Sequence, residues 1–380
     1  MNIKNAFYVS FVLLVASFAT AQVPCGGTAF ARSTSLADWT QFQSDAAHTG
    51  CNPNESILSP STVGKLQLSW TYKAGLYVSP PVVANGIAYF GSWDGKLYAV
   101  NSTTGALLWS YTTPAIIWYS PAVANGIVYV GSSTFNQNFY ALDATTGALL
   151  WTHQIGEWSA SAPVVVDGVV YVGEINGSVY ALNATTGAEL WRHLGQSGAF
   201  DIAVANGIVY VGSGDNNLRA LNASTGALLW SYPTSKAVKS PIIANGIVYF
   251  GSDYLYALNA STGALLWKET LGKGVAPLAF AAGVLYAGGS DDYFYALKSD
   301  TGQILWKYPT GAARQAVVAN GVAYVLANLD FVYGLNAVTG KIVWLSSRTG
   351  IVSGGPVIAN GMVYLGSQDY HLYAFHLPGQ

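Results

Sequence analysis

The chain has 380 residues, a formal net charge of −2 and only 9% charged residues, whereas about a quarter is usual for globular proteins. Its 16 Lys and Arg residues are spread along the sequence and form no basic cluster, which argues against a nucleic-acid-binding protein. The many glycines and tyrosines, 42 and 25 residues, favour numerous short strands joined by tight turns.

Residues 1–21 predict a cleaved secretory signal peptide. Lys4 precedes an apolar run at 6–18, and an A-x-A cleavage sequence follows at 19–21, so we expect the mature chain to begin at Gln22. A membrane anchor is the alternative, but the run is short for a span, which takes ~20 residues. No later stretch is apolar over such a length. We therefore expect a periplasmic or secreted protein whose mature chain has no transmembrane segment.

Residues 22–64 form an N-terminal extension that contains both cysteines of the chain, Cys25 and Cys51. Exported proteins meet oxidising conditions, so we expect a disulfide between them, with two unpaired thiols as the alternative. The bridge would close a loop of about 26 residues and stabilise the fold by roughly 3 kcal/mol in the chain-entropy model. No C-x-x-C-H sequence is present, so attached c-type haem is not expected.

From residue 66 onward the sequence repeats itself. The phrase A-L-[DN]-A-x-T-G-x-x-x-W returns about every 40 residues, and a period of this length indicates a repeat architecture. Its tryptophan marks the period at Trp70, Trp109, Trp151, Trp191, Trp230, Trp267, Trp306 and Trp344.

One complete unit, residues 120–151, contains four short apolar runs separated by turn sequences. Asn125-Gly126 separates the first two, and this dipeptide between apolar runs is a strong hairpin signal. No run has the length of a helix, and four antiparallel strands in about 40 residues correspond to one blade of a β-propeller. The runs are apolar on both faces, as expected when each blade packs between two neighbours.

The units predict eight blades and a ring closed by the N-terminal strand. Units start near residues 79, 120, 161, 201, 240, 277, 315 and 355. The eighth unit ends without a fourth strand, whereas residues 66–72 form a fourth strand with no three before it. Pairing the two would complete the last blade and remove exposed strand edges. We therefore expect a monomeric, all-β, eight-bladed propeller of four-stranded antiparallel blades over residues 65–380.

The chain resembles the family of pyrroloquinoline-quinone-like (PQQ-like) β-propeller repeat proteins. The resemblance rests on the repeated phrase at 141–151, 181–191, 220–230 and 257–267, on degenerate copies at 296–306 and 334–344, and on the opening DWTQFQSDAAHTGCNPN at 38–54. It implies that the eight repeat tryptophans dock between neighbouring blades, near the glycine of the repeat, and hold the ring together. Because the family contains both enzymes and non-catalytic scaffolds, this fold alone does not decide the function.

The order of the strands puts the short repetitive turns on one face of the disc and the variable loops on the other. Loops on a rigid scaffold carry function, so the variable face is the predicted binding face. Aligning the repeats on the N-G turn gives eight candidate residues around the channel mouth, which predict a polar pocket with an aromatic rim. They are Trp118, Tyr119, Glu157, Trp158, Asp201, Lys239, Arg314 and Gln315, with Lys236 and Lys273 close by. The alternative is an ordinary hydrated channel mouth that tolerates charge.

Two functions remain open from the sequence. A PQQ-dependent alcohol or sugar dehydrogenase would hold a quinone and Ca²⁺; the resemblance would make Asp201 the base and pair Lys239 or Arg314 with the carboxylates of the quinone. However, the chain lacks the adjacent cysteines that the resemblance to large alcohol dehydrogenases implies below the cofactor, and the aligned residues at the channel mouth do not supply the six to eight oxygens that calcium prefers. We favour a non-catalytic binding or scaffold protein with no metal or cofactor, whose protein or small-molecule partner binds the variable face. It then resembles the propeller lipoprotein scaffold of the outer-membrane β-barrel assembly machinery, although no convincing lipobox precedes Cys25.

Overall fold

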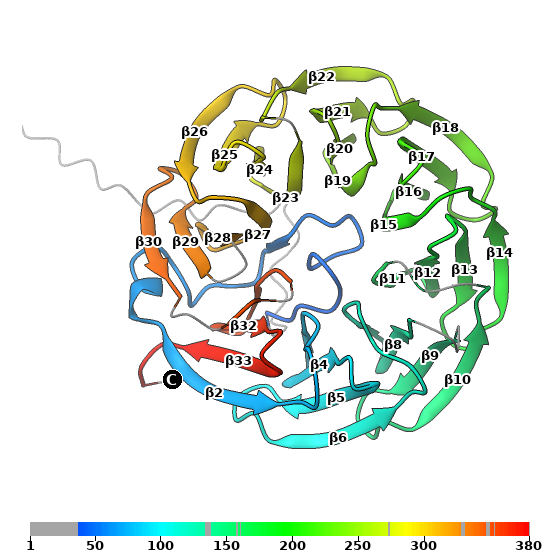
Figure 1. Ribbon diagram of the computed structural model, residues 1–380, viewed down its shortest axis with the longest axis vertical. Helices are drawn as coiled ribbons and strands as arrows, with labels where there is room; N and C mark the ends of the chain where they lie inside the picture. The colour runs from blue at the N-terminus through cyan, green and yellow to red at the C-terminus, as the bar shows by residue number, and fades with distance from the viewer. Residues whose placement is uncertain are drawn as a thin grey trace, which may run out of the picture.

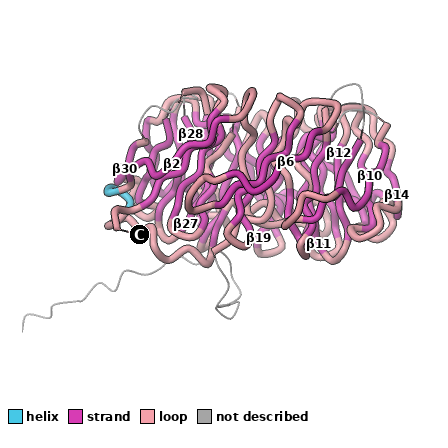
Figure 2. The backbone as a smooth tube through the Cα atoms, turned by 90° about the horizontal axis from the view of Figure 1, so that it is seen from below, coloured by secondary structure: helices cyan, strands magenta, loops and turns pink. Residues whose placement is uncertain are grey.

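Eight β-sheets stand around a central channel in the computed structural model (Figure 1). The structure describes residues 37–379 except for 134–137, 157–158, 160, 273, 328–330, 347–349 and 353. Apart from the short 3-10 helix η1 (Val63–Lys65), the described residues form strands, turns and loops. Viewed from the side, the ring is a flat disc whose strands run between its two faces (Figure 2). The predicted all-β, eight-bladed propeller is confirmed.

Blades 1 to 4 each consist of four consecutive antiparallel strands. Blade 1 contains β3 (Val82–Ala84), β4 (Ile87–Gly91), β5 (Lys96–Asn101) and β6 (Leu107–Thr112). Blade 2 contains β7 (Ala122–Ala124), β8 (Ile127–Gly131), β9 (Asn138–Asp143) and β10 (Leu149–Gln154). Blade 3 contains β11 (Val164–Val166), β12 (Val169–Gly173), β13 (Val179–Asn183) and β14 (Glu189–His193). Blade 4 contains β15 (Ala199–Ala205), β16 (Ile208–Ser213), β17 (Asn217–Asn222) and β18 (Leu228–Pro233).

Blades 5 to 7 repeat this arrangement, and blade 8 uses strands from both ends of the chain. Blade 5 contains β19 (Lys239–Ala244), β20 (Ile247–Gly251), β21 (Leu255–Asn259) and β22 (Leu265–Glu269). Blade 6 contains β23 (Val275–Ala281), β24 (Val284–Gly289), β25 (Tyr293–Lys298) and β26 (Ile304–Pro309). Blade 7 contains β27 (Ala313–Ala319), β28 (Val322–Ala327), β29 (Phe331–Asn336) and β30 (Ile342–Leu345), with β1 (Cys51–Asn52) added in parallel to β27. Blade 8 contains β31 (Val357–Ala359), β32 (Met362–Gly366), β33 (His371–His376) and β2 (Gln67–Lys73).

The ring closes through the pairing of β2 with β33. The two strands are antiparallel, with Trp70 opposite Ala374 and Lys73 opposite His371, and they lie side by side in Figure 1. The predicted completion of the last blade by the N-terminal strand is therefore confirmed. Closure gives blade 8 its fourth strand, so that every blade has a complete sheet and the ring keeps only the short outer edges usual in propellers.

In blades 1 to 7, both repetitive turns lie on the same face. In blade 1, Asn85 and Gly86 both have positive φ, +51° and +77°, which is the type I′ geometry that favours Asn-Gly. The N–H of Ser102, in the turn between the third and fourth strands, donates to the carbonyl oxygen of Gly86 at 2.9 Å. Equivalent bonds join the two turns in the next six blades. The loops that vary between blades consequently share the opposite face.

A tryptophan and a tyrosine of one blade bind the same carbonyl oxygen of the next blade. The indole nitrogen of Trp109 and the hydroxyl of Tyr89 donate to the carbonyl oxygen of Ala144 at 3.1 and 3.0 Å. Seven interfaces share this arrangement: Trp70 and Tyr364 to Ser102, Trp109 and Tyr89 to Ala144, Trp151 and Tyr129 to Ala184, Trp191 and Tyr171 to Ala223, Trp230 and Tyr210 to Ala260, Trp267 and Tyr249 to Ser299, and Trp306 and Tyr286 to Ala337.

The interface between blades 7 and 8 differs from the other seven. Blade 8 has no turn between its third and fourth strands, because the fourth strand comes from the other end of the chain. Trp344 packs edge-on against Phe375 instead, with 5.9 Å between the ring centroids. The hydroxyl of Tyr324 is buried there without a hydrogen-bond partner among the described residues. The closure of the ring thus replaces the repeated polar contact with an apolar one.

Residues 39–52, named here the channel segment, bind the innermost strand of every blade in turn. Backbone N–H groups of blades 1 to 7 donate to this segment, at Val83, Val123, Val165, Val204, Ile243, Phe280 and Val318. In blade 8 the direction reverses, since the side-chain amide of Asn52 donates to the carbonyl oxygen of Ile358 at 2.8 Å. All eight partners lie two residues before the turn that joins the first two strands. The segment lies within the central opening in Figure 1, and its hydrogen bonds place it near the face of repetitive turns.

The predicted disulfide involves this extension. Cys51 lies in β1 and is buried against blade 7. Cys25 lies outside the described residues, as does the predicted signal peptide, so both features stay predictions.

Candidate functional site

The structure distributes the predicted site residues over three places on the variable face. Glu157 and Trp158 lie outside the described residues, as does the nearby Lys273. The other six belong to the channel mouth (Tyr119, Asp201 and Gln315), to a pocket beside it (Lys239 and Arg314) and to a row of aromatic rings (Trp118).

At the channel mouth, Asp201 ties blade 4 to blade 5. Its carboxylate accepts hydrogen bonds from the backbone N–H and the hydroxyl of Ser240, both at 3.0 Å. Burial raises the pKa of Asp201, while these bonds and the charge of Lys239 oppose the rise. Burial, and then the negative charge of Asp201, raise the pKa of Tyr119 to about 12. The hydrogen bonds of Asp201 to Ser240 therefore join two neighbouring blades.

Gln315 has a comparable role between blades 7 and 8. Its side-chain oxygen accepts a hydrogen bond from the N–H of Gly355. A β-carbon on Gly355 would collide with the Gln315 side chain, so glycine permits this close approach. Gln315 also lines a small cavity together with Trp39 and Phe42 of the channel segment. Gln315 therefore contributes to the packing of blades 7 and 8 and does not line the pocket that contains Lys239 and Arg314.

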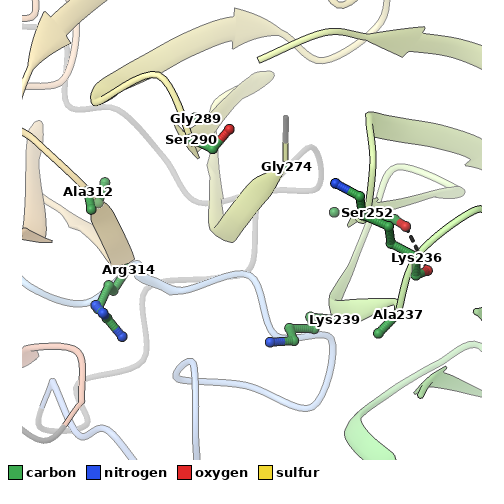
Figure 3. A pocket seen from close by; sticks show the side chains of 11 residues that line it. Lys236, Ala237, Lys239, Ser252, Gly274, Gly289, Ser290, Ala312 and Arg314 are labelled. Carbon is green, nitrogen blue, oxygen red and sulfur yellow. Dashed lines mark hydrogen bonds between the residues drawn. The ribbon is translucent and has the colours of Figure 1, made fainter. Parts of the chain in front are cut away.

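A pocket of about 440 Å³, named here the basic pocket, opens over blades 5, 6 and 7. Its charged lining residues are Lys236 in the loop before β19, Lys239 at the start of β19 and Arg314 in β27. Small residues of blade 6 separate them, including Gly274 and Ser290. Figure 3 shows the two lysines on one side of the pocket and Arg314 on the other. Its volume lies within the range of small-molecule sites, roughly 300–1,000 Å³.

Four aromatic side chains form a continuous row over blades 8, 1 and 2. Ring centroids are 5.7 Å apart between Tyr370 and Tyr77, 4.4 Å between Tyr77 and Trp93, and 4.3 Å between Trp93 and Trp118. Trp118 is 47% exposed and Tyr370 is 36% exposed. All four come from loops of the variable face. We name this set the aromatic row; only Trp118 was predicted from the sequence.

The acidic residues of these loops stabilise the loops themselves. Asp94, next to Trp93, accepts hydrogen bonds from the Tyr98 hydroxyl at 2.6 Å and from the N–H groups of Gly75 and Lys96 at 2.9 and 3.0 Å. Asp369 accepts from the Tyr373 hydroxyl at 2.5 Å in the same way. These bonds hold the backbone that carries the aromatic row.

A calcium–quinone centre is implied by the dehydrogenase resemblance, and the described residues do not fit its calcium ion. The charged residues that line the basic pocket are cations, whereas Ca²⁺ is bound by carboxylate and carbonyl oxygens. Within the described ranges, His, Cys, Asp and Glu side chains form no group of three or more that could hold a metal ion. In the same part of the chain, no helix has the length and apolar character needed to cross a membrane.

The sequence matches a family model over most of its length. The model describes the outer membrane protein assembly factor BamB, and it matches residues 56–193, 94–240, 241–319 and 309–377. The chain belongs to this family. A comparison with curated proteins found no match.

Solved structures share the fold of the chain at low sequence identity. BamB from Moraxella catarrhalis has a TM-score of 0.69 at 18% identity, covering 82% of this chain and 99% of its own. The computationally designed protein Ika8 has a TM-score of 0.73 at 17% identity, covering 83% and 99%. The quinohemoprotein alcohol dehydrogenase ADHIIG from Pseudomonas putida HK5 has a TM-score of 0.75 at 17% identity, covering 95% and 83%. An assembly factor, a designed protein and an enzyme thus share one architecture, so this likeness shows the fold alone.

Proposed function

We propose that the protein is an exported, non-catalytic scaffold that binds another protein through the variable face of the propeller. The aromatic row carries this proposal. Tryptophan and tyrosine are enriched at the centres of protein–protein interfaces, where a few such residues supply most of the binding free energy. Stacking between Trp93 and Trp118 holds the row in place before binding, which reduces the entropy lost on association.

The opposite face has turns that differ little from one blade to the next. Its turns have nearly the same sequence in each blade and repeat the same backbone geometry, with a glycine of positive φ at equivalent positions. A partner that recognised one of these turns would find an almost equivalent one in several other blades. Single-site recognition therefore favours the variable face.

The family supports a protein partner at the cell envelope. Its model describes an outer membrane protein assembly factor, and the first 21 residues have the pattern of a signal peptide. We propose a periplasmic or secreted location and a role in holding an envelope assembly together. A PQQ-dependent alcohol or sugar dehydrogenase is less well supported, since the described residues do not gather oxygen ligands for calcium.

Photo-crosslinking in the exporting cell tests this proposal. A photoreactive amino acid is placed at Trp118 or at Tyr370, and a matched control carries it at Thr145, an exposed residue of the repetitive face. We expect positions 118 and 370 to crosslink to the same protein, identified by mass spectrometry, and Trp93→Ala to weaken the crosslink at Tyr370. The proposal is wrong if the two positions yield no common adduct, or if Thr145 yields the same one.

A further inference from the structure

The basic pocket concentrates cations in a chain that has few of them. The whole sequence has 16 Lys and Arg residues among 380, yet three of them, Lys236, Lys239 and Arg314, line this single pocket. None of the lining residues is acidic. A concave site lined by one sign of charge raises the local concentration of ligands of the opposite sign.

The blade between these cations keeps the space open. Blade 6 contributes Gly274, Gly289 and Ser290 to the lining. A β-carbon built on Gly274 would meet the carbonyl oxygen of Ser252 at 3.7 Å, an ordinary van der Waals contact, and no closer described atom. The cations of blades 5 and 7 therefore face each other across a gap, with Lys236 and Lys239 opposite Arg314 (Figure 3).

The chemistry of the cations indicates the type of ligand. Arg314 is exposed and forms no ion pair with a described residue. A guanidinium group offers paired N–H donors that match the two oxygens of a carboxylate or phosphate, while an ammonium group acts as a point charge. The positive charge of Lys239 lowers the pKa of Asp201, whose carboxylate is bonded to Ser240, although burial raises that pKa more. Cations on both sides of the gap suit a ligand with more than one anionic group.

We propose that the basic pocket binds a small anion that carries at least two carboxylate or phosphate groups. A volume of about 440 Å³ accommodates a small molecule. The site lies over blades 5 to 7 and the aromatic row over blades 8, 1 and 2, so the two are separate. This inference does not depend on the proposed protein partner.

Calorimetric titration of the purified protein with citrate and, separately, with pyrophosphate tests the inference. We expect saturable binding of at least one probe, with one site per chain and an affinity that falls as salt is added. Binding of citrate alone assigns the site to carboxylates, binding of pyrophosphate alone assigns it to phosphates, and binding of both assigns it to either group. Each of these results supports the site.

Variants distinguish binding at the basic pocket from non-specific electrostatic attraction of the anion to the protein surface. Arg314→Gln and Lys239→Gln should each weaken binding by about tenfold or more, and Arg314→Lys should weaken it less than Arg314→Gln. Lys341→Gln, on the repetitive face, removes the same charge and should leave the affinity unchanged; thermal melting confirms that each variant is folded. The proposal is overturned if neither probe binds in the millimolar range, or if Lys341→Gln weakens binding as much as Arg314→Gln. Crosslinking through the aromatic row should persist in Arg314→Gln, so the two proposals can fail independently.

Discussion

The ring of Trp191 lies so close to Gly226 of the next blade that a β-carbon built on this glycine would fall 2.5 Å from it. Gly226 also has a φ of +70°, a conformation that L side chains rarely adopt. Glycine is therefore required twice at this position, by the backbone and by the docked indole. The same contact recurs between Trp109 and Gly147.

Gly226→Ala should lower the free energy of unfolding by ~3 kcal/mol, because it adds a steric clash at the blade interface to the backbone strain. Gly207→Ala, in the same blade, is the matched control. Gly207 has a φ of +74°, and a β-carbon built on it would have nothing within 4 Å, so only strain of ~1 kcal/mol is expected. Urea denaturation of both variants measures the difference. Equal losses would show that the docked tryptophan does not constrain the turn.

The carbonyl oxygen of Ala260 accepts two hydrogen bonds, from Trp230 and Tyr210. Tyr210→Phe should lower the free energy of unfolding by ~1 kcal/mol, the usual contribution of one hydrogen bond. Trp230→Phe should cost more, because apolar contact is lost as well. The double variant leaves this carbonyl without either donor, so we expect a coupling free energy of ~1 kcal/mol in a double-mutant cycle. Strict additivity would mean that the two donors stabilise the interface independently.

Ala282 occupies a turn position where most other blades have asparagine. Its φ is +49° and it is exposed, and alanine is disfavoured in this region whereas asparagine tolerates it. Ala282→Asn should therefore raise the free energy of unfolding by ~0.5–1 kcal/mol. The reverse change in blade 5, Asn245→Ala, should lower it by a similar amount, since Asn245 has a φ of +52°. Opposite shifts in the urea midpoint check this prediction; shifts of the same sign would contradict it.

The propeller architecture and the number of blades were predictable because the same sequence motif occurs once in almost every blade. Each copy of the turn and tryptophan phrase marks one blade, and the unmatched strand at residues 66–72 marks the closure. The tyrosine hydroxyls were not predicted, although Tyr89 and Tyr129 stand at equivalent repeat positions. Their shared acceptors lie about 50 residues away across an interface, as with Tyr129 and Ala184, where the separation is 55. Sequence alignment of repeats shows the tyrosine but not its partner.

The channel segment escaped prediction for a different reason. Residues 39–52 do not repeat, and most of their partners are backbone N–H groups, which carry no sequence signal. In the candidate site, the repeat alignment placed Lys239 and Arg314 at one ring position, and both line the basic pocket. The aromatic row was missed apart from Trp118, because its loops differ in length. The contact between Tyr370 and Tyr77 also depends on the ring closure that brings the two chain ends together.

His48 of the channel segment should make stability depend on pH. It is 2% exposed, its ring nitrogens have no hydrogen-bond partner among the described residues, and burial lowers its pKa from 6.5 to about 3. The unfolded chain therefore binds a proton that the folded chain does not between these values, so stability is full above pH 6.5 and falls as the pH drops toward 3. The loss approaches ~1.4 kcal/mol per pH unit at most.

His48→Asn suits the φ of +57° at this position and cannot titrate, so the unfolding free energy of this variant should fall less between pH 7 and pH 4.5. Burial raises the pKa of the neighbouring Asp45, which acts in the opposite direction but is present in both proteins. Equal losses in the two proteins, measured by urea denaturation at both pH values, would show that His48 is not the group responsible.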